Sequence, residues 1–143
     1  LPQGERIPFA RRRDLAQAEG TFDPNSQSAQ MQLGWEISDD AVAQVNAHFD
    51  RIANLAEQRE RQSLLVVDEL GRLELMRNQG LTSALALLDE GPKPAFPHAL
   101  IVVREALVDL ARERLAPAWG DPALVSPTQD AEEAIRRAFE AAR

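Results

Sequence analysis

One run of residues constrains the fold of this chain more than any other feature of its sequence. Four consecutive apolar residues, 64–67, are followed directly by Asp68 and Glu69. A continuous apolar run, unlike an alternating one, is typical of a central strand in a parallel sheet that is covered on both faces. A second run at 99–103 and a shorter one at 123–126 follow it. The sequence therefore predicts three buried parallel strands.

Amphipathic helices are expected around these strands, because apolar residues recur there at intervals of three and four. The first begins at Ser38–Asp39–Asp40, whose side-chain oxygens and negative charge suit a helix N-terminus. It should run for roughly 20 residues. Further helices are expected over 78–88, around 107–115 and from 128 onward.

The first third of the chain differs from the rest. Residues 5–12 alternate weakly between apolar and polar and residues 31–37 alternate clearly, which predicts two short strands. Residues 18–30 are rich in Gly, Asp, Pro, Asn, Ser and Gln and predict a loop. We therefore expect an antiparallel ribbon over 1–37 and a core of alternating helices and strands over 38–143.

This alternation predicts an α/β fold, in which helices pack against the faces of a mainly parallel sheet. We expect a three-layer sandwich with the ribbon near its N-terminus. The length of 143 residues fits a single domain.

Composition excludes several classes of function. With 16 Lys+Arg against 23 Asp+Glu, the formal net charge is −7, which argues against nucleic-acid binding because phosphate contacts need clustered cations. The absence of cysteine excludes disulfides, thiolate zinc sites and a cysteine nucleophile. No apolar run approaches the roughly 20 residues of a membrane span, and no signal peptide is visible. We expect a cytoplasmic protein.

Ligands bind at the carboxyl ends of the strands in such sheets, and charged residues stand at two of these ends. An apolar strand ending in Asp-Glu is the Walker B pattern, in which Asp68 would face a Mg²⁺ ion and Glu69 would polarise the water that attacks a γ-phosphate. Alternatively, Glu69 only begins a turn. Arg104, directly after the next strand, would contact phosphate oxygens or else pair with Glu105 or Asp109.

The segment 65–75 resembles the signature of the thermophile-type nucleoside-triphosphatase family of P-loop proteins. The matching residues are Asp68, Glu69, Gly71, Glu74 and Leu75. The resemblance extends loosely over about 4–126. It implies binding of an ATP- or GTP-type nucleotide and its hydrolysis with Mg²⁺ as cofactor, with Asp68 toward the metal and Glu69 as the general base.

Glu74 occupies an acidic position of that signature and is a candidate for nucleotide binding. Its physical interpretation stays open, because it could also orient the active-site loop or form a salt bridge with Arg72 or Arg77. Arg104 is the second candidate for contact with the nucleotide.

The chain departs from the family in one respect. A P-loop is G-x-x-x-x-G-K-[ST], but the single lysine, Lys93, lies between two prolines that remove amides a phosphate cradle needs. The chain also begins with Leu1 rather than Met. We expect the N-terminal strand, the P-loop and the first helix of the domain to be missing, and this 143-residue piece to be inactive.

Two other interpretations remain. The chain could be a non-catalytic regulatory or adaptor module that keeps the NTPase-like sheet and acts through a protein partner. It could also be a metal-dependent phosphoryl-transfer enzyme without a P-loop, which would need further carboxylates near Asp68. Open strand edges could also favour a homodimer.

Other residues give weaker signals. Trp35 could stack on a base, and the basic run 11–13 could approach a triphosphate or a partner. His48 and His98 have no neighbours that complete a metal site, and Ser126 has no His/Asp set for a nucleophile. Packing or surface roles are expected for these residues.

Overall fold

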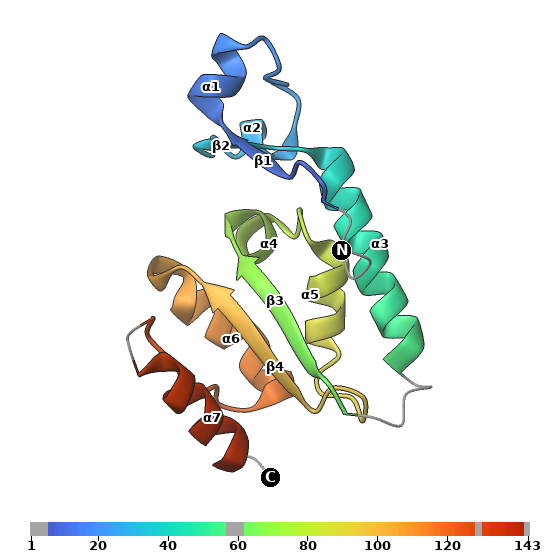
Figure 1. The fold of residues 1–143 in the computed structure, drawn as a ribbon, viewed down its shortest axis with the longest axis vertical. Helices are drawn as coiled ribbons and strands as arrows, with labels where there is room; N and C mark the ends of the chain where they lie inside the picture. The colour runs from blue at the N-terminus through green and yellow to red at the C-terminus, as the bar shows by residue number, and fades with distance from the viewer. Residues whose placement is uncertain (1–5, 57–61, 128–129, 142–143) are drawn as a thin grey trace.

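The computed structural model describes residues 6–56, 62–127 and 130–141, which form short strands and helices in two parts (Figure 1). In chain order the elements are β1 (Ala10–Arg12), α1 (Arg13–Ala18), α2 (Gln27–Gln30), β2 (Trp35–Ile37), α3 (Asp39–Ala56), β3 (Leu64–Leu70), α4 (Arg72–Arg77), α5 (Thr82–Asp89), β4 (His98–Val103), the 3-10 turn η1 (Glu105–Leu107), α6 (Val108–Trp119) and α7 (Ala131–Ala141). Helix α3 runs from the ribbon along the side of the α/β part (Figure 1).

The α/β part is organised around the parallel pair β3–β4. Leu64 lies opposite His98, and the register holds as far as Val67 opposite Ile101. A bulge then interrupts the ladder before Leu70. Helices α4 and α5 form the crossover between the two strands, as parallel strands require.

One face of this pair carries the core. Leu65, Val67 and Leu70 of β3 are at most 4% exposed and pack with Leu85 and Leu88 of α5 in one apolar cluster. Helices α5 and α6 lie on this side of the strands (Figure 1). Residues of α3 and α6 complete the same cluster; they include Phe49, Ala56, Ala111 and Leu115.

The other face of the pair is covered only in part in the described residues, because His98, the ladder partner of Leu64, packs against Phe139 of α7. Leu64, Val66 and Val102 are 42–49% exposed there. The structure confirms a mixed α/β fold with a small antiparallel ribbon and a parallel pair of strands. Within the described ranges, one face of the parallel pair carries the buried core and the other is partly exposed.

The third predicted strand is wrong. Residues 123–126 lie in an irregular segment, and Leu124 is 63% exposed. Pro122 and Pro127 flank this short apolar run, and proline cannot donate to a strand ladder. The predicted start of the last helix at residue 128 lies outside the described residues.

Two other expectations are corrected in detail. Residues 18–30, predicted to be a loop, contain the short helix α2, whose N-cap Ser26 accepts a hydrogen bond from the Ala29 amide at 3.2 Å. The helix predicted over 78–88 corresponds to α5, which begins only at Thr82. The short helix α4 before it was not predicted; Asn78 ends α4 in the left-handed conformation at φ 51°, which asparagine tolerates.

Candidate functional site

The acidic residues Asp68 and Glu69 lie near the carboxyl end of β3 and are exposed. Glu69 sits in the bulge between Val67 and Leu70 and has a φ of 70°. A non-glycine residue in this left-handed region costs about 1–2 kcal/mol. The strand end therefore holds a carboxylate in a strained backbone position, a feature that clusters at functional sites.

Arg104, directly after β4, reaches across to this strand end. Its Nε donates a hydrogen bond to Glu69 Oε1 at 2.6 Å. Pairing with Glu105 or Asp109 is not found in the described residues. Because the two side chains are 67% and 45% exposed, the ion pair contributes at most about 1 kcal/mol to stability. Two residues predicted to share a site thus lie together, in a contact that an anion can displace at small cost.

Asp68 offers one exposed carboxylate at this edge. Within the described residues no group of three or more His, Asp or Glu side chains could hold a metal ion. One carboxylate fits a Mg²⁺ that keeps several waters and is held mainly by substrate phosphates. It does not fit a cation bound by protein ligands alone, so the phosphoryl-transfer interpretation without a P-loop lacks, among the described residues, the carboxylate cluster that it needs.

Glu74 lies inside the protein and is 6% exposed. Its Oε2 accepts a hydrogen bond from the Gly71 amide, and its Oε1 accepts one from the Leu81 amide, both at 2.9 Å. These amides precede α4 and α5, so the carboxylate also lies where helix dipoles favour negative charge. No ion pair to Arg72 or Arg77 is found in the described residues. Glu74 is therefore a buried carboxylate that holds two backbone amides, and the open alternative that it orients the loop at Gly71 agrees with these contacts.

Sequence reasoning missed the residues that surround Glu74. Gly80 packs so closely that a Cβ there would lie 2.0 Å from Glu74 Oε1. The Gly80 amide donates to Gln27 Oε1, and the Gly80 carbonyl accepts from Asn46 Nδ2, both at 2.9 Å. A glycine shortly after Asn78 signals a turn, but no local pattern marks Gln27 or Asn46.

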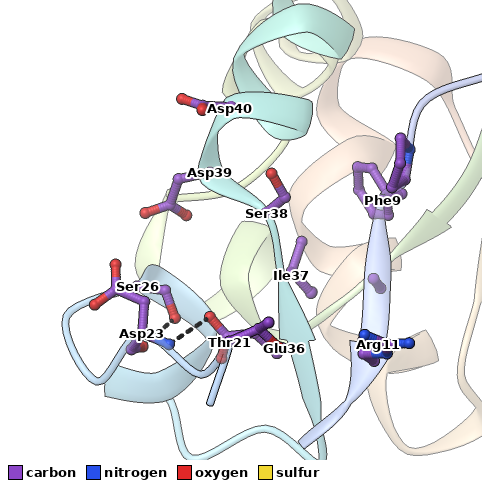
Figure 2. A pocket seen from close by; sticks show the side chains of 12 residues that line it. Phe9, Arg11, Thr21, Asp23, Ser26, Glu36, Ile37, Ser38, Asp39 and Asp40 are labelled. Atoms are coloured by element: carbon purple, nitrogen blue, oxygen red, sulfur yellow. Dashed lines mark hydrogen bonds between the residues drawn. The ribbon is translucent and has the colours of Figure 1, made fainter. Parts of the chain in front are cut away.

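The ribbon carries a hollow of about 740 Å³ that does not include the acidic strand end. Figure 2 shows Asp23, Asp39 and Asp40 on one side of it and Phe9 on the other. Glu36 Oε1 accepts from the Asp23 amide at 3.4 Å, whereas its Oε2 is buried without a partner in the described residues. A smaller hollow of about 250 Å³ lies at the opposite end of β3.

The basic run of the ribbon is used within the ribbon itself. Arg11 pairs with Glu19, and Arg12 pairs with Asp14 at 2.7 Å. The Arg13 guanidinium lies 4.9 Å from the centre of the Phe22 ring. These contacts give the run a structural role that needs no phosphate ligand.

Lys93, the single lysine, pairs with Glu90 at 2.7 Å. This pair lies between the end of α5 and the start of β4, so Lys93 precedes a strand and not the helix start that a phosphate loop would need.

The remaining candidates have local contacts. The His98 ring, at the start of β4, lies edge-on to Phe139 of α7 at 5.3 Å between centroids. Burial, followed by the nearby Arg51 guanidinium, lowers the pKa of His48 below its usual 6.5. Trp35 is 48% exposed on β2, and Ser126 is exposed in the irregular segment.

Comparison with family models, with curated proteins and with solved structures gives no match for this chain. In the described ranges, none of the helices combines the length and the apolar character needed to cross a bilayer.

Proposed function

We propose that this chain belongs to a nucleoside triphosphatase of the P-loop type and supplies the acidic half of its active site. One observation carries the proposal. Arg104 follows β4, Glu69 lies near the end of the neighbouring parallel strand β3 next to Asp68, and Arg104 Nε donates to Glu69 Oε1 at 2.6 Å. Ligands of parallel α/β sheets bind at this edge. The finer fold that the proposal implies is a three-layer sandwich with further strands beside β3 and β4.

Each residue has a role that its position supports. Asp68, exposed at the strand end, would hold Mg²⁺ together with phosphate oxygens and water. The ion would supply charge neutralisation for the transferring phosphoryl group. Arg104 would exchange its exposed contact with Glu69 for a phosphate oxygen, which the guanidinium binds well. Glu69, released from Arg104, would accept a hydrogen bond from the attacking water as general base.

The proposed hydrolysis also needs a phosphate-binding loop with a lysine. The 143 residues contain no G-x-x-x-x-G-K-[ST] sequence. The proposal therefore requires such a loop from outside these residues, and its test uses the protein as the gene encodes it.

The direct test is Glu69→Gln in the full-length protein. Turnover should fall by about 10²–10⁴-fold, the usual contribution of a general base, while the Kd for nucleotide stays nearly unchanged. Glu105→Gln is the matched control, because Glu105 is an exposed carboxylate next to Arg104 and should retain turnover. Unchanged turnover in Glu69→Gln would reject the role of Glu69.

One observation favours a second candidate, a non-catalytic adaptor. Val66 and Val102 are nearly half exposed on the partly covered sheet face, whereas parallel sheets are ordinarily covered on both faces. An adaptor would use this face to bind a protein partner. A melting temperature of the full-length protein that does not respond to Mg²⁺ and nucleotide would favour the adaptor, and a rise in melting temperature would favour the NTPase.

A further inference from the structure

The backbone at Glu69 is fixed from both sides. Before it, Val67 pairs in the ladder with Ile101. After it, Leu70 is fully buried, and the amide of Gly71 is held by Glu74. A left-handed conformation at a glutamate persists only where its surroundings over-determine it, and the hydrogen bond that holds Gly71 is one of these constraints.

Glu74 is linked to the turn at Gly80 through the next residue. Its Oε1 accepts the Leu81 amide at 2.9 Å. The fit at Gly80, whose φ is 69°, is close, since a Cβ there would lie 2.0 Å from the same oxygen. A shift of this turn would therefore be passed through the Leu81 amide to the carboxylate that holds Gly71.

A side chain of the ribbon, Gln27, is hydrogen-bonded to the turn at Gly80. Gln27, the first residue of α2, accepts the Gly80 amide at 2.9 Å through its Oε1. Its Nε2 donates to Asp39 Oδ1 at 3.2 Å. Both ends of the amide group are thus used, which fixes its orientation. Asn46 of α3 holds the carbonyl of Gly80 from the other side.

We propose that Gln27 is a positioning residue for the acidic strand end. By holding Gly80 against Glu74, the ribbon fixes the amide of Gly71 and with it the orientation of Glu69. The effect on catalysis rests on the proposed function, whereas the coupling itself is a property of this chain without nucleotide.

The coupling is tested by amide hydrogen exchange and NMR shifts in the 143-residue chain. Gln27→Ala should lower the protection of the Gly71 amide by at least about fivefold, the effect of weakening one hydrogen bond, and should shift the Glu69 resonance. The control is Gln30→Ala, because Gln30 lies on the same helix but bonds only to the Asn25 carbonyl within the ribbon. Changes confined to Gly80, with Gly71 and Glu69 as in the control, would overturn the proposal.

A double variant tests the geometry. Gln27→Glu with Asp39→Asn keeps an acceptor for Gly80 and reverses the donor and acceptor between positions 27 and 39. Protection of Gly71 should return to within about twofold of the parent chain. Failure to recover, with Gly80 again protected, would also overturn the proposal.

The catalytic consequence is measured in the full-length protein. Gln27→Ala should lower kcat and leave KM for nucleotide unchanged, because it misplaces the base without touching the ligand, and the double variant should restore kcat. If the parent protein does not hydrolyse nucleotide, the proposed function fails while the NMR result still decides the coupling. If the parent is active and kcat of Gln27→Ala is unchanged, the positioning role is wrong.

Discussion

The two strand pairs of this protein are stabilised in opposite ways. The parallel pair β3–β4 buries Leu65, Val67 and Leu70 in an apolar core. In the antiparallel pair β1–β2, every residue of β1 is exposed, and the buried side chains nearby include Ser26 and Ser28. A buried hydrogen bond adds little net free energy of folding, because the groups give up hydrogen bonds to water, and it therefore stabilises less than the burial of a large apolar side chain. The ribbon should therefore open at lower free energy than the core.

The largest expected loss of stability comes from a substitution in the apolar core. Leu88→Ala removes a side chain that is 0% exposed and should lower the free energy of unfolding by about 2–5 kcal/mol. Denaturant unfolding followed by circular dichroism measures it. Leu15→Ala is the ribbon counterpart: Leu15 is 46% exposed, and its loss should cost within about 0.5 kcal/mol. Similar losses for both variants would contradict the contrast.

A smaller loss of stability is expected from removing a buried hydrogen bond in the ribbon. Ser28 is 0% exposed, and its Oγ accepts the Ile37 amide at 3.0 Å and contacts Ser26 Oγ at 3.2 Å. Ser28→Ala leaves that amide without its acceptor, at a cost of about 1–3 kcal/mol. Faster hydrogen exchange at Ile37 with unchanged exchange at Val67 is the expected result. Loss of protection in both strands would mean that ribbon and core unfold together. Ser126→Ala, at an exposed serine, is the control.

The smallest effect concerns the helix that joins the two regions. The pKa of His48 is lowered in the folded protein, first by burial and then by Arg51, so the unfolded chain binds more protons near pH 6. The sign follows from linkage. Because the unfolded chain takes up this proton more readily than the folded protein does, the free energy of unfolding decreases as the pH falls below about 6.5. His48→Gln should flatten the fall in stability between pH 7 and 5. Near pH 8, where His48 is almost wholly neutral in both states, the slopes should agree; a slope unchanged by the mutation at low pH would contradict the assignment.

The features that could be predicted from the sequence are those encoded in contiguous residues. The apolar runs at 64–67 and 99–103 predicted the parallel pair, which the register of β3 and β4 confirms. The apolar spacing after Ser38 predicted α3, which spans Asp39–Ala56. The position of Asp68 and Glu69 at a strand end also followed from the run that precedes them.

Features that depend on distant partners could not be predicted. The run 123–126 has strand composition, but whether a strand forms depends on a neighbouring edge and on the prolines beside it. Gln27 and Gly80 are 53 positions apart, and no periodicity links them. The two amides that hold Glu74 belong to the starts of two helices, and the first of these helices, α4, was not predicted from the sequence. The chemical roles of Asp68, Glu69 and Arg104 stay predictions.

The left-handed backbone of Glu69 also has an evolutionary consequence. Glycine adopts a φ of 70° without strain, and asparagine adopts it more easily than glutamate does. A library randomised at position 69 and sorted for folding alone is therefore expected to enrich Gly and Asn. Proteins that keep Glu at this position during evolution are expected to be less stable than those with Gly or Asn. Retention of Glu would then indicate that its carboxylate is selected for a function.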